Sequence, residues 1–252
     1  DNGVPLFVDN TFATPYLCNP FDHGADLVWH STTKWIHGSG STIGGALVDG
    51  GTGSWDEWGY EEIAEPNPAY HGINFHEAVG DLAFTFAARA RGLRDLGNQQ
   101  SPFDGWVTLQ KIESLPLRMQ RHADNAMAVA EYLEGHPEVS WVNYPGLASH
   151  ETHDNASEYL DNGYGGMITF GLEAGYEAGR RLCRETELAS LLANVGDAKT
   201  LIIHPASTTH QQLTDEEQQA SGVTDDLVRL SVGLEATDDI IADIDQAIEA
   251  ST

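Results

Sequence analysis

Two short apolar runs near the start of the chain constrain its fold most strongly, because each run ends in polar residues. Residues 6–8 lead to Asp9, and residues 26–30 (DLVWH) lead to the Ser-Thr-Thr-Lys segment at residues 31–34. A third candidate strand, residues 46–48, lies in a glycine-rich stretch. Strands that are apolar on both faces are typical of a parallel sheet covered by helices. The beginning of the chain therefore predicts an α/β unit.

The polar residues after the first two runs form a candidate ligand site. Open α/β sheets bind ligands outside the carboxyl ends of their strands. The hydroxyls of Ser31 and Thr33 suit a phosphate, and the amine of Lys34 suits a Schiff base. The carboxylate of Asp9 suits a pyridinium nitrogen. Each residue also has a plainer interpretation, because a Ser-x-Thr-Lys segment can be an ordinary turn and an aspartate after a strand can cap a helix or turn.

Helix signals follow this region. Residues 53–76 are irregular and indicate a long surface insertion, whereas residues 84–96 have helical composition. Ser101-Pro102 marks a helix start. Pro116 should kink or break that helix, and a second helix is expected from about Leu117 to Gly135.

The second half of the chain mixes strands and helices. Residues 139–144, 167–170, 201–204 and 227–232 are strand candidates. Thr214 and Glu217 form a capping box, and Thr237 is expected to cap a last helix with an apolar stripe. Arg229 interrupts the last apolar run, and its planar fork matches a carboxylate. An internal ion pair or a solvated strand face is the alternative for Arg229.

Charge and composition exclude several functions. The chain carries 12 Lys and Arg against 39 Asp and Glu, a formal charge of −27. Such a surface repels the phosphates of nucleic acids, and it suggests a salt-adapted protein with an acidic mesophilic protein as the alternative. No apolar run approaches the ~20 residues of a membrane span. Two cysteines and no metal-binding motif argue against a disulfide framework and a metal site, and they favour the cytoplasm.

The motifs of the chain resemble one family throughout its length. The segments that carry the resemblance are residues 7–15 (FVDNTFATP), 24–28 (GADLV), 30–34 (HSTTK), 115–119 (LPLRM), 144–147 (YPGL), 204–210 (HPASTTH) and 229–235 (RLSVGLE). They are similar to those of the Cys/Met-metabolism enzymes that depend on pyridoxal phosphate. Residues 70–72 (YHG), 193–197 (ANVGD) and 209–213 (THQQL) most resemble O-acetylhomoserine sulfhydrylases.

The resemblance implies a fold, a cofactor and site residues. The fold would be type I, aspartate-aminotransferase-like, with a partial parallel or mixed sheet domain (residues 1–118) and a smaller α+β C-terminal domain (residues 119–252). Pyridoxal 5'-phosphate would be held by Asp9, Ser31, Thr33 and Lys34, with Lys34 as the catalytic residue. Arg229 would bind the substrate carboxylate, and Thr200 would contribute near it.

The resemblance also implies an activity. The enzyme would be a transferase of methionine biosynthesis that converts O-acetyl-L-homoserine and sulfide, or a thiol, into homocysteine, or a thioether, and acetate. It would act as a homo-oligomer, a tetramer by resemblance. A cystathionine γ-synthase, a methionine γ-lyase, a plain phosphate-binding module and an inactive assembly subunit are the alternatives.

Two departures from the family pattern are visible. Ser39, His37, Lys111 and Trp35 differ from the usual residues of the family. Ser39 and His37 would alter the loop behind Lys34. Members of the family are also longer, and we expect this chain to lack their N-terminal part. A sheet without its first strands would expose an edge and apolar helix faces, so poor solubility or tight self-association is expected of this piece alone.

Overall fold

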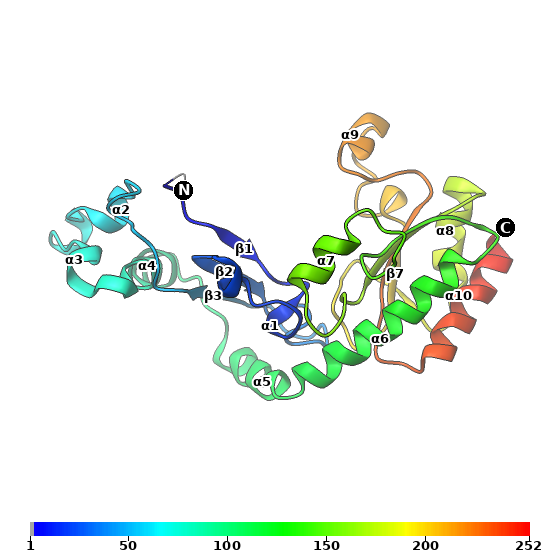
Figure 1. Cartoon of the computed structure of the whole chain (residues 1–252), viewed down its shortest axis with the longest axis horizontal. Helices are drawn as coiled ribbons and strands as arrows, with labels where there is room; N and C mark the ends of the chain where they lie inside the picture. The colour runs from blue at the N-terminus through cyan, green and yellow to red at the C-terminus, as the bar shows by residue number, and fades with distance from the viewer. Residues whose placement is uncertain (1–2) are drawn as a thin grey trace. The chain divides into compact units, whose positions relative to one another are not determined.

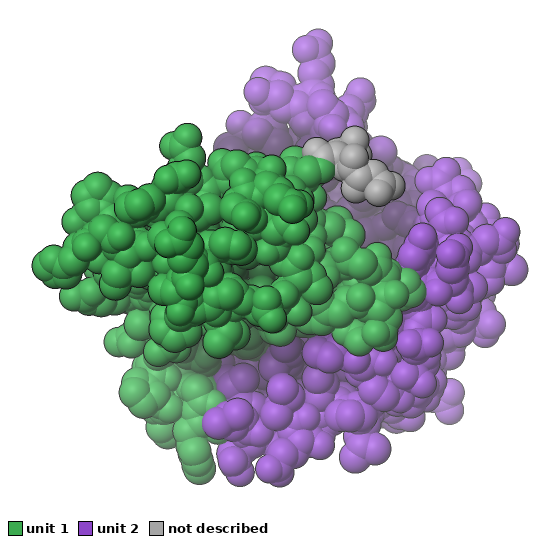
Figure 2. Space-filling view, turned by 60° about the vertical axis from the view of Figure 1, so that its left-hand side comes forward, with its two compact units in different colours: residues 1–11, 19–32, 43–107 green, residues 12–18, 33–42, 108–252 purple. Residues whose placement is uncertain are grey.

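The computed structural model describes residues 3–252 (Figure 1). Contacts divide the chain into two compact units, shown in Figure 2. Unit 1 comprises Asp1–Thr11, Asn19–Thr32 and Ile43–Val107, and unit 2 comprises Phe12–Cys18, Thr33–Thr42 and Thr108–Thr252. The predicted division into domains at residue 118 stays a prediction. Within residues 3–252, no helix has the length and apolar character to cross a membrane.

The sheet of unit 1 contains β1 (Phe7–Asp9), β2 (Leu27–Ser31) and β3 (Gly45–Asp49), in that order. β1 and β2 are parallel, as predicted, with Asp9 opposite Trp29. The expectation of a parallel third strand is wrong, because β3 runs antiparallel to β2. Two parallel strands must be joined by a crossover connection, usually a helix, that brings the chain back to the end of the sheet where the first strand began. No helix interrupts residues 32–44 in the described structure, so the chain turns back.

The expected surface insertion instead contains an apolar core of its own. The short helices α2 (Glu61–Ala64), η2 (Pro68–Tyr70), α3 (Phe75–Val79) and η3 (Gly80–Leu82) lead into α4 (Ala83–Ala88), which continues as the π-helix η4 (Arg89–Asp95). Trp55, Ile63 and Phe75 are buried among these elements. Trp55 stacks on Phe84 and meets Tyr60 edge-on. The interpretation of this region as irregular surface loop is therefore wrong, because its aromatic residues pack on one another.

Unit 2 is built on a mixed sheet with the order β4-β5-β8-β7-β6. The strands are β4 (Val139–Asn143), β5 (Met167–Leu172), β6 (Ser190–Leu191), β7 (Leu201–Ile203) and β8 (Leu227–Ser231). Four of them confirm the predicted strands, and the short β6 was not foreseen. The helices of this half are α6 (Leu115–Glu134), α7 (His153–Tyr159), α8 (Gly175–Glu185), η5 (Pro205–Ser207), α9 (Asp215–Ala220) and α10 (Thr237–Ser251). The short α1 (Thr14–Leu17) and η1 (Pro20–His23) lie near the start of the chain.

Helices α6, α8 and α10 cover the core of unit 2, and α6 and α10 pack side by side (Figure 1). Pro116 lies in the first turn of α6 and separates it from α5 (Pro102–Ile112), which confirms the predicted break. The capping box of Thr214 and Glu217 is also confirmed. The predicted cap of the last helix is wrong: Ala236 is the cap, and the hydroxyl of Thr237 donates to Oδ1 of Asn125 instead.

Candidate functional site

In unit 1, Thr11 joins the two strand ends that carry predicted cofactor residues. The side chain and backbone N–H of Thr11 both donate to Oδ1 of Asp9. The hydroxyl oxygen of Thr11 in turn accepts the backbone N–H of Ser31 at 2.8 Å. Since both bonds to Asp9 reach Oδ1, its Oδ2 remains able to accept a proton donor from a ligand. The parallel pairing of β1 and β2 therefore brings Asp9 and Ser31 to one sheet edge, as predicted.

Two buried polar atoms beside Ser31 have no partner within the described part of the chain. They are Nδ1 of His30 and Oγ1 of Thr32. Burial lowers the pKa of His30, although the charge of Asp9 and the backbone of Asn10 oppose that shift. Buried polar groups without partners are rare in proteins and need an explanation, such as a catalytic role or a bound water or ion. The end of β2 thus carries hydrogen-bonding capacity that the described protein atoms leave unused.

In unit 2, the amine of Lys34 is held by the loop between β6 and β7. Its Nζ donates to Oδ1 of Asn194 at 2.5 Å. The pKa of Lys34 is lowered, first by burial and second by the positive charge of Arg229. A lowered pKa gives the neutral, nucleophilic amine at a lower pH than an ordinary lysine. The amide oxygen of Asn194 accepts this hydrogen bond without adding a negative charge, so it orients the amine.

A close backbone approach places this loop against Lys34. A Cβ atom added at Gly196 would lie 2.6 Å from the backbone nitrogen of Trp35, and the φ of Gly196 is +75°. Only glycine meets both conditions without strain. The N–H of Gly196 donates to the hydroxyl of Ser231 at 3.0 Å, which fixes the turn against the end of β8. Gly196 therefore explains how Asn194 reaches the lysine.

Arg229 lies in β8, opposite Thr169 on β5 and Ile203 on β7. Its side chain is half-buried, and burial lowers its pKa. Within residues 3–252 its guanidinium has no hydrogen-bond or ion-pair partner. The alternative of an internal ion pair is therefore wrong for the described chain. A half-buried fork of N–H donors without a carboxylate is suited to binding one from a ligand.

Thr200 is engaged inside the protein. Its backbone N–H donates to Oε1 of Glu235 at 2.7 Å, and its hydroxyl donates to Oε2 at 2.9 Å. The same hydroxyl accepts the N–H of Gly233 at 2.9 Å. Thr200 thereby fastens the segment after β8 to the start of β7. A substrate contact by Thr200 stays a prediction.

The structure thus brings together Asp9 with Ser31 in unit 1, and Lys34 with Arg229 in unit 2. Thr33 is half-buried and directly precedes Lys34. The predicted approach of Asp9 to Lys34 joins residues of different units and stays a prediction. Thr11 and Asn194 were missed as site residues. Asn194 lies in the segment ANVGD, whose Gly-Asp pair signals a tight turn, but nothing local shows what that turn touches.

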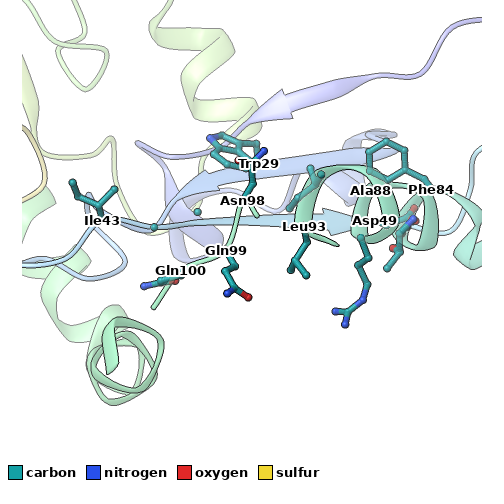
Figure 3. A pocket seen from close by; sticks show the side chains of 15 residues that line it. Trp29, Ile43, Asp49, Phe84, Ala88, Leu93, Asn98, Gln99 and Gln100 are labelled. Atoms are coloured by element: carbon teal, nitrogen blue, oxygen red, sulfur yellow. Dashed lines mark hydrogen bonds between the residues drawn. The ribbon is translucent and has the colours of Figure 1, made fainter. Parts of the chain in front are cut away.

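A cavity of about 720 Å³ in unit 1 is not this site. Figure 3 shows its lining, which includes apolar side chains such as Trp29, Phe84 and Leu93, the amide of Gln100 and the carboxylate of Asp49. Neither Asp9 nor Ser31 lines it. Leu47 and Ile43 beside it are exposed.

Comparison with known proteins decides the family. The model of the Cys/Met metabolism PLP-dependent enzymes matches residues 1–249. The chain belongs to this family. The predicted family and its cofactor, pyridoxal phosphate, are confirmed. The chain is 55% identical over 252 residues to a homocysteine synthase of Schizosaccharomyces pombe, covering 99% of this chain and 59% of that protein.

Two further relatives agree with this result. An O-acetyl-L-homoserine sulfhydrylase of Leptospira meyeri is 50% identical, covering 98% of this chain and 58% of its own length. A crystal structure assigned as an O-acetylhomoserine (thiol)-lyase of Campylobacter jejuni, with a pyridoxyl group on a lysine, has a TM-score of 0.91 and 42% identity. It covers 98% of this chain and 59% of its own. The fold is therefore type I, as predicted, and the chain spans somewhat less than 60% of the length of these relatives.

The residues present fit the cofactor of the family. The lowered pKa of Lys34 suits attack on an aldehyde, and the hydroxyls of Ser31 and Thr33 lie two residues apart before it. Oδ1 of Asp9 is fixed by Thr11, which leaves Oδ2 for a protonated ring nitrogen. In the sequence, Thr32, whose Oγ1 has no partner in the described chain, separates the two phosphate-binding candidates. An amine, hydroxyls and a carboxylate are the kinds of group that suit the aldehyde, the phosphate and the ring nitrogen of pyridoxal phosphate.

Proposed function

We propose that the complete protein transfers sulfur, converting O-acetyl-L-homoserine and sulfide, or a thiol, into homocysteine, or a thioether, and acetate. The observation that carries the proposal is the amine of Lys34, which has a lowered pKa and a hydrogen bond to Asn194. The names of the relatives in Schizosaccharomyces pombe and Leptospira meyeri support the choice of substrates. The chain spans less than two thirds of the length of those relatives, so the activity is proposed for the complete protein.

The roles of the residues follow from their chemistry. Lys34 would hold pyridoxal phosphate covalently, Ser31 and Thr33 would bind its phosphate, and Oδ2 of Asp9 would keep its ring nitrogen protonated. When bound, the cofactor supplies the electron sink that allows bonds at the substrate's Cα and Cγ to break. Nζ of Lys34 would take the proton from Cα once the substrate amine has displaced it. Its lowered pKa favours the neutral form that this step needs.

Arg229 would orient the substrate. Its guanidinium, which lacks a partner in the described chain, would bind the α-carboxylate through two parallel N–H donors. Its positive charge also disfavours protonation of Lys34, so one residue binds the substrate and helps to prepare the base. We further propose that the protein acts as a cytoplasmic homo-oligomer.

Covalent labelling tests the proposal directly. The chain has three lysines, so borohydride reduction with pyridoxal phosphate followed by peptide mass spectrometry assigns the label without ambiguity. We expect a stable label on Lys34, its loss in Lys34→Ala, and full labelling in Lys199→Ala, the matched change of an exposed lysine. A label spread over all three lysines, or its absence from Lys34, would contradict the cofactor site.

Product analysis tests the reaction. The enzyme expressed from its complete coding sequence should release acetate from O-acetyl-L-homoserine only when sulfide or a thiol is present. Arg229→Lys keeps the positive charge but loses the two parallel N–H donors that bind a carboxylate. The loss of a hydrogen bond to a charged group costs about 1.5–3 kcal/mol. We therefore expect kcat/KM to fall by about 10-fold to 150-fold, at one tenfold step per 1.4 kcal/mol. Preferred turnover of cystathionine or methionine would overturn the proposed substrates.

A further inference from the structure

The segment that follows Lys34 is held by a cation from helix α6. Nη1 of Arg118 donates to the carbonyl of Trp35 at 2.6 Å, and its Nη2 donates to the carbonyl of Ile36 at 2.8 Å. Nη2 also donates to the carbonyl of Lys111 at 3.1 Å. Within the described residues, Arg118 has no carboxylate partner. Its Nε donates to the hydroxyl of Ser114 at 3.3 Å. The guanidinium therefore binds uncharged oxygens only, and two of these are the carbonyls directly after Lys34.

The side chains of the same segment pack on the same helix. Trp35 is fully buried and Ile36 is 4% exposed, in a cluster with Leu115 and Met119 of α6. Trp35 also meets the ring of His122 edge-on, with the centroids 4.7 Å apart. Residues 35 and 36 are thus fixed to α6 through both their side chains and their carbonyls.

The turn is closed so tightly that it needs a glycine. The N–H of Gly38 donates to the carbonyl of Lys34 at 2.7 Å, and the φ of Gly38 is +69°. A Cβ at Gly38 would overlap Nη1 of Arg118. The carbonyl of Gly38 accepts the N–H of Ala198 at 3.0 Å, in the loop that also carries Asn194. The backbone of Lys34 is therefore fixed from α6 on one side, and its amine is fixed by Asn194 on the other.

We propose that Arg118 is a positioning residue for Lys34: by binding the carbonyls of Trp35 and Ile36, it fixes the turn that directs the lysine amine to Asn194. The proposal rests on the proposed role of Lys34 in the reaction. Arg118 touches no reacting atom and acts through the backbone. A lysine at this position would keep the charge, but its single ammonium cannot match the planar fork that binds two successive carbonyls.

The first test measures Lys34 in the chain without cofactor. The pH dependence of its labelling by an amine-acylating reagent is followed by mass spectrometry, with exposed Lys199 as an internal reference. In Arg118→Lys the turn should be held less rigidly. The amine of Lys34 can then move away from Asn194 and from the positive charge of Arg229. We then expect the labelling midpoint of Lys34 to rise toward the ordinary lysine pKa of 10.5, while that of Lys199 stays unchanged.

Two further variants separate positioning from stability. Arg121→Lys is the matched control, because Arg121 lies on the same helix, is exposed and donates to the carbonyl of Glu235. It should leave the midpoint of Lys34 unchanged. In Gly38→Ala the added Cβ would displace the guanidinium of Arg118. The labelling midpoint of Lys34 should therefore shift in the same direction as in Arg118→Lys. Lower melting temperatures with an unchanged midpoint in both variants would overturn the proposal.

The holoenzyme supplies a second readout. In the enzyme loaded with pyridoxal phosphate, Arg118→Lys should shift the pH dependence of the cofactor's visible absorption band and lower kcat more than it raises KM. A wild-type protein that takes no label on Lys34 counts against the proposed function. A labelled wild type whose Arg118→Lys variant keeps the same pH profile counts against the positioning role alone.

Discussion

One buried histidine on α6 links protonation to folding. His122 is fully buried, and its Nδ1 lies 2.7 Å from the carbonyl of Val232, so the neutral ring donates there. Its Nε2 has no partner within the described chain. Protonation would place a second N–H where nothing accepts it. Burial therefore lowers the pKa of His122 to about 4, and the charge of Arg118 adds to that effect.

This histidine predicts a loss of stability in mild acid. An unfolded histidine titrates near 6.5, so between pH 6.5 and 4 the unfolded chain binds a proton that the folded chain refuses. The His122 contribution to the free energy of unfolding should fall by about 3 kcal/mol over that range. Urea unfolding of wild type and His122→Gln at a series of pH values checks this. The variant should lose that part of the slope, whereas exposed His23→Gln should keep it.

Single residues show what sequence could predict of the site. Asp9 and Lys34 could be predicted because each follows the end of an apolar strand, and Arg229 because it interrupts one. A charged side chain at such a position requires a structural or functional explanation. Asn194 and Thr11 were not found, because their roles depend on which loops meet in space. Asn194 lies 160 residues from the lysine it orients. Local sequence carries no signal for a contact across that distance.

At the scale of elements, periodicity and capping predicted most helices and strands of unit 2. The direction of β3 and the folding of residues 53–76 were not predicted, for one physical reason. Both depend on which side chains pack against one another in the folded chain, and not on the local propensity for helix or strand. The aromatic residues of that region indicated a surface loop by their irregular spacing. In the structure, the same residues supply a core: Trp55 is 2% exposed.

The apolar cluster around Trp55 should unfold independently of unit 2 when the side chain of Trp55 is removed. Trp→Ala in a core typically costs about 3–5 kcal/mol, and this cluster contains few other buried residues. In Trp55→Ala we expect faster amide hydrogen exchange in α3 and α4, with little change in α6 and α10 of the other unit. Trp58→Ala removes a partly buried neighbour and should have a smaller effect. Equal acceleration throughout both units would show that the two cores unfold together.

At the scale of the whole chain, acidic charge dominates and is rarely compensated. Against a formal charge of −27, the described residues form three ion pairs, two of which involve histidines. The third, between Arg180 and Glu177, is a local contact within α8. Most carboxylates therefore face water and one another. Their mutual repulsion opposes the compact state, and only these three ion pairs offset it in the described structure.

Salt should accordingly stabilise this protein. Raising the ionic strength from about 0.1 M to 1 M shortens the screening length from about 10 Å to 3 Å, which weakens repulsion between exposed charges. The melting temperature, followed by circular dichroism, should fall steadily as potassium chloride is lowered from molar to millimolar concentrations. Sucrose is the control, because it favours compact states without screening charge. If sucrose restores the melting temperature as fully as salt, or if salt has no effect, repulsion is not the cause and the chain is an ordinary acidic protein.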